Sequence, residues 1–171
     1  NFVESDSYTI AKKAAMMVDH FHEQIIAKGK IGGQARAMVV TASIPRCIEY
    51  YYAINKSLAD RHSPYKTIIA FSGECKYNGQ EPPLTSASLN GFSDAKIPKT
   101  FKLDSYRILI VADMFQTGFD EPLLHTMYVD KMLYDIKAVQ TLSRLNRCHP
   151  QKHDTFVLDF ANAPEIIEKS F

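Results

Sequence analysis

The stretch I-L-I-V-A-D-M-F-Q-T-G-F-D-E-P at residues 108–122 decides the fold class of this chain. Its first five residues, 108–112, form a continuous apolar run that is typical of a strand buried on both faces of a parallel sheet. The run leads into a loop that contains Gly118, Asp120 and Pro122. Because functional loops in parallel sheets gather at the carboxyl ends of the strands, candidate site residues are sought there.

Four further runs predict the rest of the sheet, and helical patterns separate them. The other expected strands are 37–42, 67–71, 126–129 and 155–160. The expected helices are 6–28, about 46–61, about 136–147 and 163–170. Buried strands that alternate with helices indicate an α/β domain with a mostly parallel sheet.

The first expected helix has one apolar stripe with spacings of three and four residues, as a helix packed on a core requires. The stripe consists of Ile10, Ala14, Met17, Phe21 and Ile25. Gly29 is placed to end this helix, and Gly32 and Gly33 predict a hinge-like break.

Residues 72–100 differ from the rest, because Ser, Gly, Asn, Pro and Lys dominate and the periodicity is weak. A segment of this length without clear structure is either a functional loop or partly disordered. We therefore expect an N-terminal helix and hinge at 1–33, followed by one lobe at 34–171 with a loop-rich insertion at about 72–100.

The composition limits the function classes. With 171 residues, 46% hydrophobic, the chain is long enough for one domain with a real core, and a disordered tail, collagen and a coiled coil are excluded. It has neither the ~18-residue apolar run of a membrane span nor a signal-peptide pattern, so we expect a soluble protein. The net charge of +1 means that a contact with nucleic acid must come from a local patch. The first residue is Asn1, so we expect a segment of a longer protein.

Cysteine and histidine spacing argues against a metal site. The cysteines are odd in number and widely spaced: Cys47, Cys75 and Cys148. This spacing predicts neither a disulfide framework nor a zinc knuckle, and it fits a reducing compartment. His149 and His153 have the spacing of a helical metal pair, but Pro150 between them should break the helix, so we assign no metal site.

A second informative segment is Q-T-L-S-R-L-N-R-C-H-P at residues 140–150. On the predicted helix Arg144 and Arg147 share one face, with Gln140 one turn back. The planar guanidinium group matches phosphate oxygens, so one arginine can bind a phosphate while the other stabilises charge in a transition state. The alternative is a solvated helix face that contributes little.

The other candidates also have ordinary structural interpretations. Thr41 and Ser43 end the first strand, where hydroxyls and backbone N–H groups can hold a phosphate, but Ser43 can equally cap the following helix. Gly118 can be a turn glycine, and Asp120 can be a helix cap or an acceptor for a ribose hydroxyl. Since no G-x-x-x-x-G-K-[ST] occurs, the chain lacks a triphosphate cradle of its own.

The order of these segments resembles the second RecA-like lobe of superfamily 2 helicases and translocases. Thr41–Ser43 match motif IV, residues 111–120 match motif V, and residues 140–147 match motif VI, whose usual form is Gln-x-x-Gly-Arg-x-x-Arg. Ser143 stands where motif VI usually has Gly, and Ala112 stands where many relatives have Thr in motif V.

Three stretches look like one branch of this superfamily, the motor (R) subunit of type I restriction endonucleases. They are N-G-F at 90–92, V-A-D-M-F-Q-T-G-F-D-E-P-L-L-H-T-M-Y-V-D-K at 111–131 and A-V-Q-T-L-S-R-L-N-R-C-H-P at 138–150. The resemblance covers about residues 36–165. It implies a three-layer RecA-like domain with a mostly parallel sheet, preceded by an extra N-terminal helix.

The resemblance also implies roles for the candidate residues. Arg147 would be the arginine finger of an ATP-dependent translocase, and Arg144 its partner on the phosphates. The implied nucleotide-binding residues are Gly118, Asp120 and Gln140. The implied contacts to the DNA backbone are Thr41, Ser43, Gln116 and Thr117. ATP and Mg²⁺ would be bound mainly by a first RecA-like lobe upstream in the same chain.

The parent protein would be a type I site-specific deoxyribonuclease in the cytoplasm of a bacterium or archaeon. Its partners would be double-stranded DNA and the modification and specificity subunits, and the segment alone would be inactive. The alternatives are another superfamily 2 motor that acts on DNA or RNA, a degenerate lobe that only docks partners, and an unrelated doubly wound domain. The last is disfavoured because no Gly-rich loop follows the first strand.

Overall fold

The computed structural model describes residues 2–112, 121–132 and 140–161, with the backbone alone for residues 2–9. Within these residues, five strands form one sheet in the order β2-β3-β1-β4-β5, and every pairing is parallel. The strands are β1 (Arg36–Thr41), β2 (Lys66–Ala70), β3 (Tyr106–Val111), β4 (Leu124–Asp130) and β5 (Phe156–Asp159). The predicted α/β class and all five predicted strands are confirmed.

The central strand β1 shows why the fold has three layers. All six of its residues are buried, and it pairs with β3 on one side and β4 on the other. Successive side chains of a strand point to opposite faces, so β1 contributes to two separate cores. Val39 belongs to one core cluster and Val40 to the other. Both faces of the sheet must therefore be covered.

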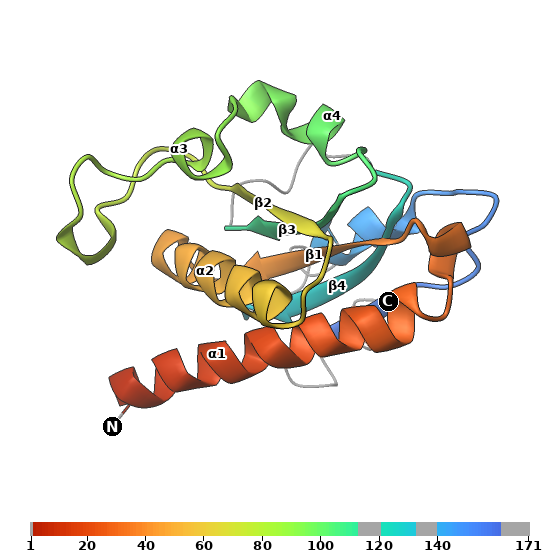
Figure 1. The fold of residues 1–171 in the computed structure, drawn as a ribbon, viewed down its shortest axis with the longest axis horizontal. Coiled ribbons are helices and arrows are strands. Elements are labelled where there is room, and N and C mark those ends of the chain that lie inside the picture. The colour runs from red at the N-terminus through yellow and green to blue at the C-terminus, as the bar shows by residue number, and fades with distance from the viewer. Residues whose placement is uncertain (1, 113–120, 133–139, 162–171) are drawn as a thin grey trace.

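One face is covered by α1 (Phe2–His20) and α2 (Ile44–Asp60), which lie next to each other on the same side of the sheet (Figure 1). A π-helical turn, Phe21–Ile26, continues α1. All five residues of the predicted apolar stripe are buried in the core of this face. Gly29 follows with a φ of +67°, a left-handed conformation that glycine adopts without strain, and a 3₁₀ turn spans Lys30–Gly33. The predicted helix and its end are confirmed.

The core of the other face lies under two short helices. These are α4 (Ile97–Thr100) and the 3₁₀ helix η5 (Ser143–Asn146). Ile97 of the first and Leu145 of the second, together with the adjoining residues Phe101 and Leu142, are almost fully buried against the sheet. No helix in the described part of the chain is long and apolar enough to cross a bilayer.

Residues 72–100 contain regular structure, so the expectation of a segment without clear structure is wrong. The segment holds η3 (Tyr77–Gly79), α3 (Ser86–Asn90), η4 (Asp94–Lys96) and α4. The Ser86 hydroxyl bonds both the N–H and the carbonyl of Phe71, and the Asn90 amide does the same for Ile69, at 2.7–3.0 Å. Because β2 is an edge strand, these side chains satisfy backbone groups that a neighbouring strand would otherwise bond.

The predicted helix at about 136–147 ends before Arg147. Residues 133–139 lie outside the described residues, and the described part tightens into η5 and stops at Asn146. Arg147 already has extended dihedral angles (φ −72°, ψ 136°). The prediction that Arg144 and Arg147 share one helical face is therefore wrong, because Arg147 follows the last turn instead of belonging to it. The predicted helix at 163–170 also lies outside the described residues.

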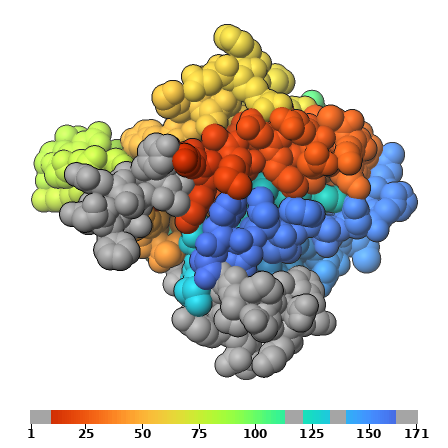
Figure 2. All heavy atoms as spheres, turned by 90° about the horizontal axis from the view of Figure 1, so that it is seen from below, coloured from red at the N-terminus to blue at the C-terminus, as the bar shows by residue number. Residues whose placement is uncertain are grey.

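The N-terminal helix packs into the same core cluster as β1 and α2. Figure 2 shows the segment that begins with α1, in red to orange, lying against residues 140–161, in blue. The division of the chain at residue 33 stays a prediction.

Candidate functional site

The predicted site residues lie at two opposite edges of the sheet. Thr41 and Ser43 are at the carboxyl end of β1. Arg144 and Arg147 are at the amino edge, because the loop that follows them leads directly into the first residue of β5. A six-residue strand spans roughly 20 Å, so the two pairs are far apart. The other candidates in the β3–β4 connection, Gln116, Thr117, Gly118 and Asp120, lie outside the described residues.

Thr41 and Ser43 both make structural hydrogen bonds. Thr41 is fully buried, and its hydroxyl donates to the Val111 carbonyl at 2.8 Å. Ser43 has extended dihedral angles, and its hydroxyl accepts from the Arg46 N–H at 3.3 Å, which makes it the N-cap of α2. The capping interpretation of Ser43 is confirmed, whereas the DNA contacts of both residues stay predictions.

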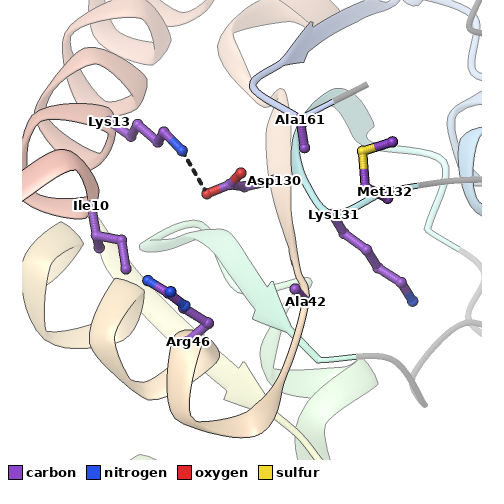
Figure 3. Close-up of a pocket in the computed structure, with 8 residues that line it drawn as sticks. All are labelled: Ile10, Lys13, Ala42, Arg46, Asp130, Lys131, Met132 and Ala161. Atoms are coloured by element: carbon purple, nitrogen blue, oxygen red, sulfur yellow. Dashed lines mark hydrogen bonds and ion pairs between the residues drawn. The ribbon is translucent and has the colours of Figure 1, made fainter. Parts of the chain in front are cut away.

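A pocket of about 260 Å³ opens beside Ala42 at this carboxyl edge (Figure 3). Lys13 reaches across from α1 to Asp130 at the end of β4, with 3.1 Å between Nζ and Oδ2 (Figure 3). Arg46 from α2 and Lys131 also line the pocket. Three of the lining side chains are cations and one is an anion, so the pocket has a positive balance.

Asp130 also accepts a hydrogen bond of 2.5 Å from the Tyr50 hydroxyl. Burial and the bond to Asp130 raise the pKa of Tyr50 well above its usual range, so this hydroxyl stays a neutral donor. The sequence analysis missed Asp130 and Lys131, although both follow a predicted buried strand directly, which is the position where it looked for site residues.

At the amino edge the structure brings the two predicted arginines together. Arg144 is partly buried and Arg147 is exposed. Burial lowers the pKa of the Arg144 guanidinium, and the nearby positive charge of Arg147 lowers it further. Gln140, also a candidate, is exposed and begins the described helical turn, and its carbonyl accepts a bond from the Ser143 hydroxyl at 2.9 Å. An arginine remains protonated through such a shift, so the pair presents two charged guanidinium groups.

Residues 147–155 connect the arginines to β5; we call them the arginine loop. Lys152 donates to the carbonyls of Leu145 and Arg147, at 2.5 and 2.9 Å. Asp154 accepts from Lys30 at 2.7 Å and bonds His125 at 2.8 Å. A shallow pocket lies along this loop between Leu145 and Thr155, and Arg147 and Lys152 both line it. The guanidinium group of Arg147 beside this open surface suits an anion such as a phosphate group.

The two histidines of the arginine loop differ in their surroundings. His149 Nδ1 bonds the Gln151 N–H at 3.1 Å, and His153 is exposed. Among the residues that the structure describes, no group of three His, Cys, Asp or Glu side chains is placed to hold a metal ion. The sequence analysis missed Lys152, Asp154 and His125, because no motif spacing marks them.

Comparison with known proteins gives one family and a consistent set of relatives. The family described as type I restriction enzyme subunit R domain 3 matches residues 90–162. A putative type I restriction enzyme MjaVIIP endonuclease subunit from Methanocaldococcus jannaschii is 28% identical over 152 residues, which are 79% of this chain and 14% of that protein. The HindI endonuclease subunit from Haemophilus influenzae is 28% identical over 142 residues, 81% of this chain and 13% of that protein. The chain thus spans about a seventh of the length of these relatives.

Solved structures confirm the fold. Domain 2 of the DEAD-box helicase Mss116p, bound to an RNA duplex, matches 94% of this chain and 56% of that chain, with a TM-score of 0.56 and 15% identity. The ATP-dependent type ISP restriction-modification enzyme LlaBIII, bound to DNA, matches 89% of this chain and 10% of that chain, with a TM-score of 0.53 and 12% identity. The predicted RecA-like lobe and the predicted resemblance to type I restriction R subunits are therefore both confirmed.

Proposed function

We propose that this chain, a helicase-like segment related to the R subunits of type I restriction enzymes, is the second lobe of an ATP-dependent motor that moves along double-stranded DNA. The observation that carries the proposal is the pair Arg144 and Arg147 at one edge of a RecA-like sheet. Burial and the charge of Arg147 lower the pKa of the Arg144 guanidinium. Two adjacent guanidinium groups match the charge of a triphosphate.

In this motor ATP is the substrate, and the first lobe upstream holds most of it together with Mg²⁺. This lobe adds Arg147 as the arginine finger and Arg144 on the phosphates, with Gln140, Gly118 and Asp120 around the nucleotide. An arginine finger is worth about 10³–10⁵ in rate in phosphoryl-transfer enzymes. Since the finger reaches the nucleotide only when the lobes close, binding and hydrolysis drive opening and closing.

The carboxyl edge would grip DNA in the same cycle. Ser43, Gln116 and Thr117 would contact the DNA backbone, and Thr41 would contribute through its main chain because its hydroxyl bonds Val111. The cations of the pocket beside Ala42 add attraction for phosphates. Contacts to the backbone carry no base information, so site recognition falls to the specificity subunit, in a complex that also holds the modification subunit. The parent is then a type I site-specific deoxyribonuclease whose cleavage residues lie outside this segment.

Replacement of Arg147 by Ala in the parent protein tests the proposal. We expect DNA-stimulated ATP hydrolysis to fall at least about 10³-fold, because the charge that stabilises the transition state is lost. Arg61→Ala is the matched control, since Arg61 pairs with Asp19 and Glu23 on the surface of α1 and its continuation. Turnover by Arg147→Ala close to that of the control would exclude the finger. The 171-residue chain alone should hydrolyse no ATP, and hydrolysis by a clean preparation would reveal a complete site within it.

A second candidate is a motor of the same superfamily that acts on RNA. The likeness to a helicase domain bound to an RNA duplex favours it, although that likeness rests on 15% identity. Stimulation of the parent ATPase by duplex DNA, single-stranded DNA and RNA separates the two. The restriction motor responds most to duplex DNA, and a greater response to RNA would favour the second candidate.

A further inference from the structure

We infer that Lys152 is a positioning residue for the arginine finger: its ammonium group fixes the backbone from which Arg147 projects. The inference rests on the proposed function, because Arg147 needs a fixed position only if it meets ATP. Lys152 itself would touch neither the nucleotide nor the DNA.

The hydrogen bonds of Lys152 connect the backbone of a core residue, Leu145, to the backbone of Arg147. Its Nζ donates to the carbonyl of Leu145 at 2.5 Å and to the carbonyl of Arg147 at 2.9 Å. Leu145 is 1% exposed and packs in the core beneath the sheet, so it does not move independently of the lobe. Lys152 therefore ties the backbone of Arg147 to that of a residue whose side chain is buried in the core.

The end of η5 explains why a side chain is needed there. The helix stops at Asn146, and the last carbonyls of a helix lack N–H partners from the next turn. A lysine near the C-terminal end of a helix can bond these carbonyls. Here one ammonium group bonds the carbonyls on both sides of Asn146, so it also fixes the extended conformation in which the chain leaves the helix.

The far end of the arginine loop has an anchor of its own. Asp154 bonds Lys30, in the turn that follows α1, and His125, which is buried in β4. Gln151 packs on Gly32 so closely that a Cβ atom there would lie 2.5 Å from its side-chain oxygen. The contact between the N-terminal segment and residues 140–161 is the one visible in Figure 2. The loop is thus held at its far end by Asp154 and near Arg147 by Lys152.

The surroundings of Lys152 favour loss of its charge at high pH. Burial lowers the pKa of the ammonium group, and the negative charges that Cys148 and Glu121 can carry partly offset this shift. A guanidinium group at the same position keeps its charge at any pH used for an assay. The dependence of kcat on pH therefore distinguishes the wild type from the Lys152→Arg variant.

The test uses the full-length parent subunit in its complex and follows DNA-stimulated ATP hydrolysis. We expect Lys152→Met to lower kcat about 10- to 100-fold and to change the KM for ATP less than about threefold, because a displaced finger weakens the transition state more than ground-state binding. Lys152→Arg should recover most of kcat and move the alkaline fall of kcat to higher pH. Lys56→Met is the control, since Lys56 is exposed and pairs with Asp60, one turn away on α2.

A double-mutant cycle separates positioning from general stabilisation. In an Arg147→Ala background, single-turnover rates should fall less than about twofold when Lys152 is also replaced, because Lys152 acts through Arg147. If Arg147→Ala alone leaves turnover intact, the proposed function fails and this inference with it. If Arg147→Ala is inactive but Lys152→Met keeps kcat within twofold, or if the two losses multiply, only this inference fails. If Lys152→Met does not fold, Lys152→Gln takes its place in the test, because the Gln side chain retains a hydrogen-bond donor. We then expect a kcat between those of the wild type and of Arg147→Ala.

Discussion

The two edges of the sheet use their charged side chains in different ways. At the amino edge, three charged side chains bond backbone carbonyls, beside ion pairs such as Lys30–Asp154. Arg36, which is 1% exposed, donates to the carbonyls of Gln34, Phe101, Lys102 and Leu103. Arg107 and Lys152 bond carbonyls of their own surroundings in the same way. At the carboxyl edge, by contrast, Lys13 and Asp130 pair with each other beside an open pocket.

This difference indicates that charged side chains have different roles at the two edges. A bond to a backbone carbonyl fixes the course of the chain, and its loss leaves a buried acceptor without a donor. A pair of partly exposed side chains can exchange one partner for a phosphate at little cost. Under the proposed function, the amino edge would hold an arginine in one position, and the carboxyl edge would bind a moving polyanion.

The largest expected effect tests the amino edge directly. Burial and the charge of Arg107 lower the pKa of Arg36 to about 10, so Arg36 is charged at neutral pH and its bonds are charge-assisted. We expect Arg36→Met to lower the free energy of unfolding by about 3 kcal/mol, because one buried and three partly buried carbonyls lose their charged donor. Lys13→Met, at the carboxyl edge, should cost at most about 1 kcal/mol. Urea unfolding of both variants measures the two free energies of unfolding. Equal losses in the two variants would show that charged side chains contribute alike to stability at both edges.

The contrast also shows what the sequence can and cannot predict. The stripe from Ile10 to Ile25 and the run at 108–112 are local patterns, and both elements form as predicted. The hydrogen bonds that protect the edge strand β2 come from Ser86 and Asn90, whose partners lie 15 and 21 residues away in the sequence. A local periodicity in the sequence therefore cannot predict them.

The site follows the same rule. The sequence singles out Arg144 and Arg147 as candidates, but it predicts neither the extended conformation of Arg147 nor the supports of the arginine loop. Asp154 bonds Lys30 from 124 residues away, and such a pair becomes visible only when the strands are in register. The end of η5 before Arg147 was also missed, because it depends on the bonds that Lys152 makes to the helix end.

A smaller effect separates the two interpretations of Ser43 at the carboxyl edge. Ser43→Ala should cost about 1 kcal/mol of stability, because the hydroxyl that caps α2 is lost. Ser43→Asp keeps a capping oxygen, so it should leave stability nearly unchanged while weakening binding of the parent to DNA about 5- to 10-fold through repulsion of phosphates. Titrations at two salt concentrations check this expectation. DNA affinity equal to that of the wild type would reduce Ser43 to a helix cap.

The smallest effect concerns acid and the far anchor of the arginine loop. Burial lowers the pKa of His125 despite its bond to Asp154, so the folded state disfavours the imidazolium form. The unfolded chain then binds more protons than the folded one, and stability falls as the pH drops below the ordinary histidine value of about 6.5. The bonds from Lys30 and His125 lower the pKa of Asp154, so its contribution persists at that pH and disappears only at lower pH, near its folded pKa.

His125→Gln removes the first of these titrations. We expect stability to decline less between pH 7 and pH 5 in this variant than in the wild type, as measured by urea unfolding at each pH. His20 contributes a decline of the same sign, since burial and the charge of His125 lower its pKa, so some dependence should remain. His153→Gln is the control, because His153 is exposed on the same loop. If the two variants decline equally, His125 is not the acid-sensitive part of the anchor.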